Sequence, residues 1–233
     1  MDIVLFMIDS SPKETQRDPV RFSRLIEIAL KTDIQEINLV SRRDFKIEEP
    51  ALNQIPEKIV SKEKGIFNKI KPEKLRKNHI QTDHFELASL LAFLGKDLKT
   101  TAFFFFEDEP EELTYDGSHS ILKFARASSE KSSAILGLKR IPFSGIHQYK
   151  LLKGTLVGEG EYRINAAFRV DHPLQSSSNL ALMKRFILRP PFFKILDSSL
   201  LRNHENAFLD ALDTFVKTEP VYGYLPFIPL KIK

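Results

Sequence analysis

Three consecutive carboxylates are the part of this sequence best suited to chemistry: Glu107, Asp108 and Glu109, followed at once by Pro110. Grouped carboxylates repel one another unless protons or a cation lie between them, and their hard oxygen atoms favour Mg²⁺ or Mn²⁺. They directly follow an uncharged run, residues 101–106, which predicts a strand buried on both faces of a parallel sheet. In open α/β sheets, ligands bind at the carboxyl ends of the strands. The acids are therefore a candidate cation site, and the alternative is a solvated acidic turn at the end of a core strand.

The composition indicates a globular protein with one sizeable core or two small ones, because 42% of the 233 residues are hydrophobic. No apolar run approaches the roughly 18 to 20 residues that a membrane span needs. The first residues lack the basic region and cleavage site of a secretory signal. The sequence has no cysteine, which is compatible with a reducing compartment, and we expect a cytoplasmic protein. A formal net charge of +4 does not by itself favour nucleic acid as a partner.

The amino-terminal part predicts a strand, a helix and a second strand. Residues 3–8 form an apolar run that ends at Asp9 and Ser10. Asp18 followed by proline caps a helix whose apolar residues recur at helical spacing as far as Lys31. Residues 36–40 are the second strand, and Arg42 follows it closely. Short connections of this kind make a βαβ unit, so the central sheet is expected to be mostly parallel.

The rest of the chain predicts a more β-rich second half. The expected elements are a helix over 85–94 that is capped at Asp83, a helix over 118–130, a strand over 134–138, a hairpin within 148–170, an apolar run over 180–183, a stiff break at the paired prolines 190 and 191, a helix capped by Asn203, and a tail over 221–230 that can form only an edge segment. We expect a single domain over residues 1–233, with an α/β first half and a more β-rich second half.

Lysine and arginine are concentrated between Lys62 and Lys77. Prolines at positions 50, 56 and 72 interrupt any regular secondary-structure pattern in and before this stretch. Such a stretch suits contact with the phosphates of a nucleotide, a nucleic acid or a lipid surface. The alternative is a solvated insertion with no ligand.

The order of these elements resembles the GT-A glycosyltransferases, particularly the family-2-like group. Three stretches carry the resemblance: the opening strand with Asp9 and Ser10 together with residues 34–40, the run of phenylalanines that ends in Glu107, Asp108 and Glu109, and residues 204–210, which look like the acid-bearing helix start of that family. The likeness lies in pattern and spacing more than in identity, and it covers most of the chain.

The resemblance implies a single α/β domain of GT-A type, with a nucleotide-binding half over 1–110 and an acceptor half over 111–233. Such a domain would move a sugar from a nucleotide-sugar donor, a UDP-sugar above all, to an acceptor hydroxyl. Mn²⁺ or Mg²⁺ would bridge the diphosphate to Asp108, Glu109 or Glu107 and neutralise the leaving group. Glu205 would deprotonate the acceptor. The implied nucleotide contacts are Asp9, Ser10 and Arg42, and the acceptor would be a glycan or a lipid-linked molecule, which adds the inner face of a membrane as a candidate location.

Each of these roles has a plainer alternative. A glutamate in a first helical turn is already explained by the helix dipole, and an aspartate after a strand is often a turn former. For the whole chain, the competing class is a non-catalytic module that binds a nucleotide, or binds nucleic acid through residues 62–77.

Overall fold

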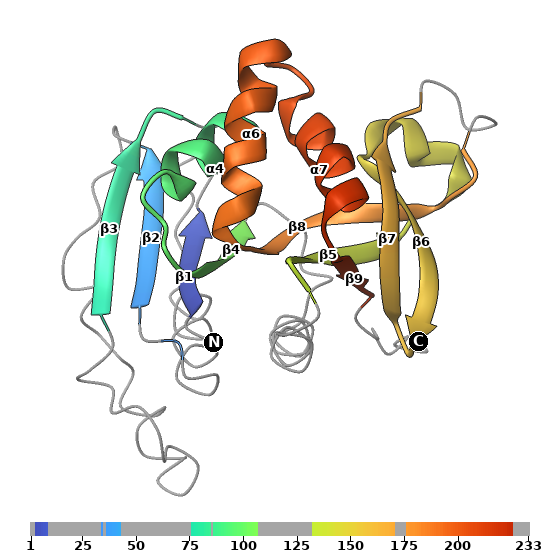
Figure 1. Ribbon diagram of the computed structural model, residues 1–233, viewed down its shortest axis with the longest axis horizontal. Coiled ribbons are helices and arrows are strands. Elements are labelled where there is room, and N and C mark those ends of the chain that lie inside the picture. The colour runs from blue at the N-terminus through green and yellow to red at the C-terminus, as the bar shows by residue number, and fades with distance from the viewer. Residues whose placement is uncertain are drawn as a thin grey trace, which may run out of the picture.

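The computed structural model describes residues 3–8, 34, 36–42, 76–84, 86–106, 132–170 and 176–225 (Figure 1). The predicted helices over 18–31 and 118–130, most of the basic stretch over 62–77, and the tail beyond residue 225 lie outside these ranges.

Within the described residues the strands are β1 (Ile3–Ile8), β2 (Glu36–Arg42), β3 (Arg76–Thr82), β4 (Thr101–Phe106), β5 (Ala134–Arg140), β6 (Leu151–Gly158), β7 (Glu161–Phe168), β8 (Leu180–Leu188) and β9 (Val221–Tyr224). The helices are α4 (Leu87–Gly95), α6 (Pro190–Arg202) and α7 (Ala207–Thr218), with a short 3₁₀ segment, η2 (Phe143–Gln148), between β5 and β6.

These strands form one mixed sheet in the order β3-β2-β1-β4-β8-β5-β9-β7-β6. The neighbours β3, β2, β1 and β4 are all parallel. Beyond β4 most pairings are antiparallel, and β9 is parallel to β5. The predicted α/β fold, with a parallel first half and a β-rich second half, is therefore confirmed. The prediction that the tail forms an edge segment is wrong for its first residues, because β9 lies between β5 and β7.

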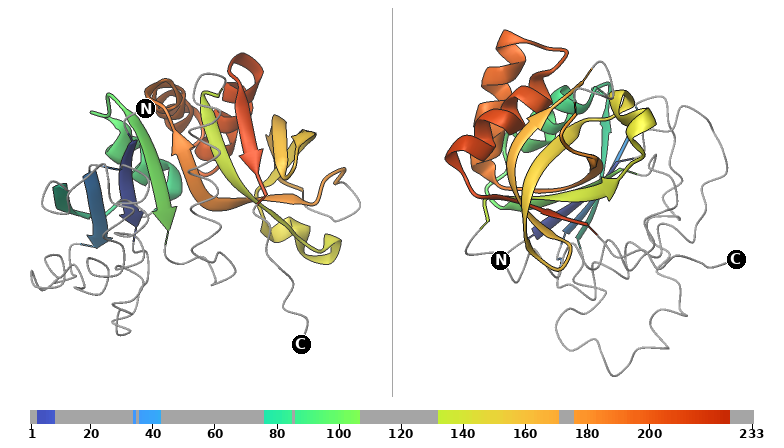
Figure 2. Two further views of the ribbon diagram at one scale, coloured as in Figure 1. Left: turned by 90° about the horizontal axis from the view of Figure 1, so that it is seen from below. Right: turned by 90° about the vertical axis from the view of Figure 1, so that its right-hand side faces the viewer.

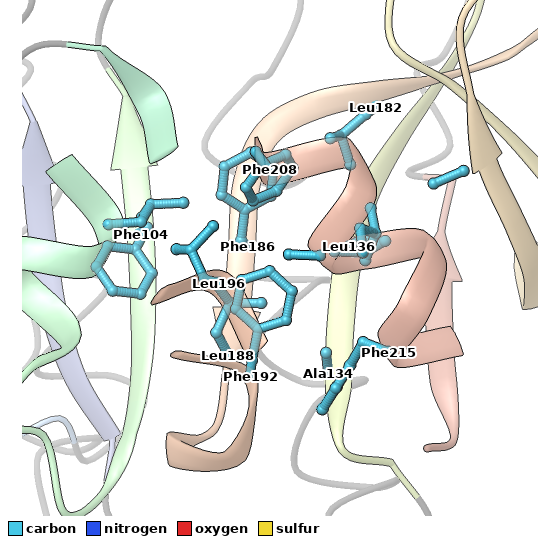
Figure 3. Packing of buried hydrophobic residues seen from close by; sticks show 14 of the residues in the cluster. Phe104, Ala134, Leu136, Leu182, Phe186, Leu188, Phe192, Leu196, Phe208 and Phe215 are labelled. Carbon is cyan, nitrogen blue, oxygen red and sulfur yellow. The ribbon is translucent and has the colours of Figure 1, made fainter. Parts of the chain in front are cut away.

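One face of the sheet is covered by α4, α6 and α7, which lie side by side across both halves (Figures 1 and 2). Aromatic side chains make the central contacts. The ring of Phe104 in β4 stacks on Phe6, with centroids 5.1 Å apart, and meets Phe193 of α6 edge to face at 6.0 Å. On the other side, Phe192 of α6 packs edge to face on Phe208 and Phe215 of α7. Figure 3 shows the rings of Phe104, Phe192, Phe208 and Phe215 in this core.

The sequence analysis did not predict two elements, the helix α6 and the strand β3. Pro190 and Pro191 were expected to break the chain, but they occupy the first positions of α6, where proline needs no hydrogen-bond partner for its nitrogen. The strand β3 is polar and pairs with β2 alone within the described sheet, so it lacks the apolar run that marks a buried strand. Arg76 and Lys77 thus belong to a strand and not to an irregular insertion, and Arg76 forms a salt bridge of 2.9 Å with Glu36.

Helix boundaries also moved. Asp83 was expected to cap α4, but Glu86 does so, because its carboxylate accepts a hydrogen bond of 3.0 Å from the Ser89 amide. The last helix begins at Ala207, after Asn206, so the predicted cap at Asn203 is wrong. Asn203 instead ends α6. No helix within the described ranges is long and apolar enough to cross a bilayer.

Candidate functional site

The carboxyl ends of β1, β2, β3 and β4 meet at one edge of the sheet because these strands are parallel. Two helix ends lie on the same side. The first turn of α4 follows β3, and the turn between α6 and α7 approaches it, with Ser89 Oγ and His204 Nε2 3.2 Å apart. Figure 1 shows the α6–α7 turn at the top, on the side to which the arrowheads of β1, β2 and β3 point. The edge is therefore bordered by side chains of both halves of the chain.

Lys150 is the most unusual charged group near this edge. It immediately precedes β6, and its carbonyl oxygen accepts a hydrogen bond of 2.9 Å from the Leu182 amide in β8. Its side chain is half-buried, and Nζ lies 5.6 Å from the centroid of the Phe208 ring at the start of α7. No carboxylate of the described residues forms an ion pair with it. A half-buried ammonium group that has no ion pair within the described ranges is a candidate to bind an anion.

The surroundings of Lys150 are electropositive. The pKa of Lys150 is lowered from 10.5 to about 8, mainly by burial and in part by the positive charges of Arg169 and Lys184. Glu86, the cap of α4, acts in the opposite direction. Lys184 precedes Arg185, which pairs with Phe105 of β4, so it lies near the carboxyl end of that strand. Among the residues that the structure describes, three cations and one acid thus interact here, an arrangement that favours an anion.

Asn206 adds an unused hydrogen-bond acceptor near the same ring. It stands directly before α7, and its side chain makes no capping bond. Its Oδ1 atom is buried and has no hydrogen-bond donor among the described residues. Asn206 is two residues from Phe208, the aromatic residue beneath Lys150. Lys150 and Asn206 are therefore two polar groups that lie close to Phe208.

Most of the predicted nucleotide and metal residues fall outside the described ranges. This holds for Asp9, Ser10, Glu107, Asp108 and Glu109. The strands before them are described, and Ile8, the last residue of β1, pairs in register with Phe106, the last residue of β4. The two loops therefore begin from neighbouring positions on one edge. Within the described residues no group of three or more potential ligand side chains could hold a metal ion.

The structure describes the backbone of Arg42 and both the backbone and the side chain of Glu205. Arg42 ends β2 opposite Thr82 of β3, so its backbone lies at the expected edge. Glu205 was expected in the first turn of a helix, but it lies in the exposed turn between α6 and α7. The acid in the first turn of α7 is Asp210, which accepts a hydrogen bond of 3.2 Å from Asn203 Nδ2. The general-base role of Glu205 stays a prediction.

The sequence analysis missed Lys150, Arg169 and Lys184. Lys150 stands between a 3₁₀ segment and a strand, and no motif marks it. Lys184 carries a usable signal, because it interrupts the run of apolar residues at Leu180–Leu188 together with Arg185. Charged residues inside an apolar strand are rare unless they have a partner or a function. Their convergence with Lys150 depends on strand pairing that sequence spacing does not reveal.

No family model matches the sequence. The UTP–glucose-1-phosphate uridylyltransferase of Staphylococcus haemolyticus is 27% identical over 216 residues, which cover 86% of this chain and 72% of that protein. A crystal structure of a UDP-glucose pyrophosphorylase complexed with UDP-glucose superposes with a TM-score of 0.65 at 16% identity, covering 97% of this chain and 91% of the other. A CMP:2-keto-3-deoxy-manno-octonic acid synthetase complexed with CTP has a TM-score of 0.56 at 11% identity, with 97% and 90% coverage.

These comparisons refine the fold assignment. The chain has the GT-A-like, Rossmann-related fold of nucleotidyltransferases. The predicted fold, a single α/β domain of GT-A type, is therefore confirmed. The narrower prediction of a family-2-like glycosyltransferase is corrected. The proteins that this chain matches are named as uridylyltransferases, pyrophosphorylases and a synthetase. One fold can carry several unrelated activities, so the pattern of strands and acids alone does not separate these classes.

Proposed function

We propose that this protein binds a nucleotide and a phosphorylated sugar at the edge described above and catalyses nucleotidyl transfer between them. In that reaction a phosphate oxygen of the sugar 1-phosphate attacks the α-phosphorus of UTP, the bond to the β-phosphate breaks, and pyrophosphate leaves. The proposal draws on the similarity to the Staphylococcus uridylyltransferase over most of the chain. The observation that carries it concerns Lys150, which is half-buried and under the influence of the positive charges of Arg169 and Lys184. Lys150 itself forms no ion pair with a described residue.

Lys150 is suited to hold a phosphate oxygen at this edge. An incoming phosphate would bring a negative charge to the Lys150 ammonium group, and a charge-assisted hydrogen bond in a partly desolvated place is strong. The buried Oδ1 atom of Asn206 would accept a hydrogen bond from a sugar hydroxyl. The protein groups would thus orient the phosphorylated sugar, and orientation supplies much of the rate in transfers between two bound substrates.

A divalent cation remains part of the proposal as a prediction. The consecutive carboxylates Glu107, Asp108 and Glu109 follow β4 directly and have the oxygen chemistry that Mg²⁺ and Mn²⁺ prefer. A cation held there would neutralise charge on the phosphates. Replacing Asp108 by asparagine tests this part separately from Lys150.

The test of the proposal is calorimetric titration with UTP, glucose 1-phosphate and UDP-glucose, joined to an assay for pyrophosphate release. Lys150→Met should weaken binding of the phosphorylated sugar by roughly tenfold to a hundredfold, the value of a charge-assisted hydrogen bond. The matched control is Lys139→Met, because Lys139 also lies over an aromatic ring, 4.8 Å from the centroid of Tyr149, and Tyr149 packs against a separate apolar cluster. Equal losses in both variants, or no binding by the wild type, would refute the site.

Asn206→Ala distinguishes the proposed contact to the sugar hydroxyl from the proposed contact to the phosphate. It should weaken binding of glucose 1-phosphate by a few-fold and leave binding of inorganic phosphate unchanged, because the amide oxygen has no attraction for a phosphate oxygen. A loss for both ligands would assign the effect to a rearranged α7 start and not to the hydroxyl contact.

Sugar transfer to a glycan or lipid-linked acceptor is the second candidate, and the exposed position of Glu205 at the same side favours it. The two reactions release different products. Nucleotidyl transfer releases pyrophosphate, whereas glycosyl transfer releases UDP from UDP-glucose and should collapse in Glu205→Gln. A non-catalytic module that uses residues 62–77 on nucleic acid would release neither product, and its binding would fall steeply with salt.

A further inference from the structure

The helix α4 contacts the second half of the chain at both of its ends. At its carboxyl end, a Cβ atom on Gly95 would overlap the ring of Phe193 in α6, so this ring fits because glycine has no side chain. At its amino end, Ser89 Oγ lies 3.2 Å from His204 Nε2 in the α6–α7 turn, within hydrogen-bond distance. Ser89 and Gly95 are about 9 Å apart along the helix axis. The apolar contact is therefore buried in the core, and the polar contact borders the candidate site.

The hydrogen bond between Ser89 and His204 is connected on both sides to Lys150. On the α4 side, the Ser89 amide donates a hydrogen bond of 3.0 Å to the carboxylate of Glu86, the acid whose charge acts on Lys150. On the other side, His204 comes four residues before Phe208, and the centroid of the Phe208 ring lies 5.6 Å from Lys150 Nζ. These five residues form a closed circuit of interactions that joins the two halves of the chain.

The turn between α6 and α7 has no other hydrogen bond or ion pair to the first half within the described ranges. Residues 202–205 are exposed, and the hydrogen bonds of Asn203 and Asn206 stay within α6, the turn and α7. The first buried residue after the turn is Ala207. Because the turn has so few apolar contacts of its own, its hydrogen bond to Ser89 determines how closely it approaches α4.

We propose that Ser89 and His204 are positioning residues, which hold the α6–α7 turn against α4 so that Asn206 and Phe208 keep their places beside Lys150. The inference rests on the proposed function, in which Lys150 and Asn206 orient the phosphorylated sugar. Residues that support a site in this way need not touch the ligand themselves. An exposed hydrogen bond adds little to the stability of a fold, so its removal should affect the site more than it affects unfolding.

The first test needs no ligand and follows the titration of Lys150 Nζ by NMR in the full chain. Ser89→Ala removes the hydroxyl but keeps the amide that Glu86 caps, and His204→Ala removes the imidazole from the other side of the contact. In both variants the start of α7 should move, and Phe208 should cover Lys150 less. A less buried amine holds its proton to a higher pH, so Nζ should titrate at a higher pH than in the wild type.

The matched control for this titration is Asn165→Ala. Asn165 in β7 makes an exposed side-chain hydrogen bond of 3.0 Å to Thr155 in β6, away from the α6–α7 turn, so its loss should leave the Lys150 titration unchanged. An unchanged titration in Ser89→Ala and His204→Ala would overturn the proposal. An equal shift in Asn165→Ala would overturn it too, because the shift would then not depend on the contact with α4.

The second test measures binding of glucose 1-phosphate and UTP by calorimetry. Ser89→Ala and His204→Ala should each weaken binding of glucose 1-phosphate by about threefold to tenfold, the value of one hydrogen bond, and should change UTP binding by less than about twofold. The double variant should lose no more than either single variant, because both substitutions remove one shared contact. His204→Gln should recover most of the affinity, since the glutamine side-chain amide can still bond to the hydroxyl.

The outcomes of the second test separate this inference from the proposed function. Additive losses in the double variant, or equal losses for UTP and glucose 1-phosphate, would overturn the positioning role. A wild-type protein that does not bind glucose 1-phosphate would refute the proposed function, whereas an unchanged Lys150 titration in Ser89→Ala and His204→Ala would refute the positioning contact.

Discussion

The two halves of the sheet contribute different parts of the candidate site. In the parallel half, β1 to β4 bring their carboxyl ends to one edge, where the loops with Asp9 and the acids 107–109 begin. The antiparallel half supplies the described cations, from β8, from the residue after β7, and from the residue before β6. Regular parallel strands place loops by topology alone, whereas the second half places individual side chains by pairing that is particular to this chain. The predictions below test how strongly the halves depend on each other.

The largest expected effect comes from Phe192→Ala. Phe192 is fully buried in α6, and its ring meets Phe193, Phe208 and Phe215, so it connects the helices that cover both halves. Its truncation should lower the free energy of unfolding by about 3 to 5 kcal/mol. The halves should still unfold in one transition, because the core cluster spans β1, β4, β5, β7 and β8 without a break.

Urea denaturation followed by both tyrosine fluorescence and circular dichroism measures this loss. Phe143→Ala is the matched control, since Phe143 is 52% exposed and its loss should cost less than about 1 kcal/mol. Two separate transitions in the wild type would contradict the connection and would show that the halves are independent units.

An intermediate effect, with a defined pH dependence, is expected for Lys150→Met. The pKa of Lys150 is lowered to about 8 by burial, so at neutral pH the folded protein holds a proton on this amine at a cost. Between about pH 8 and the ordinary lysine value of 10.5, the unfolded state binds more protons than the folded state, and wild-type stability rises with pH. Below pH 8 the cost is constant.

Lys150→Met should therefore stabilise the ligand-free protein by up to about 3 kcal/mol at pH 7, and the gain should vanish by about pH 10.5. Urea denaturation at a series of pH values measures both variants, with Lys139→Met as the control for loss of a lysine above an aromatic ring. A gain that does not change with pH would show that packing of methionine on Phe208, and not the buried charge, is responsible.

The smallest expected effect is that of Glu86→Ala. Glu86 caps α4 through the Ser89 amide and is exposed, so its loss should cost about 1 kcal/mol. It also removes the carboxylate that raises the pKa of Lys150, so that pKa should fall further. Measuring the Nζ titration by NMR in Glu86→Gln and Glu86→Ala separates the two effects, because glutamine can still cap the helix but carries no charge.

Much of the parallel half was predictable because its signals are local. The apolar runs at residues 3–8 and 101–106 became β1 and β4 with the expected bounds, since a strand buried on both faces has no reason to alternate. The edge strand β3 was missed for the opposite reason. Its polar residues are satisfied by neighbours that are distant in sequence, as in the hydrogen bond of 3.0 Å from Asn78 Nδ2 to Asn38 Oδ1.

The sequence by itself determined the fold class, the existence of β1, β2 and β4, and the position of the acids directly after β4, because hydrophobic periodicity and turn residues act within a few residues. The tertiary structure alone decided that the charges of Arg169 and Lys184 act on Lys150, which lies beside Phe208, and that β9 is inserted between β5 and β7. Burial and charge–charge interaction depend on distances across the sheet. Those distances follow from strand pairing between residues that lie tens of positions apart, which no local pattern records.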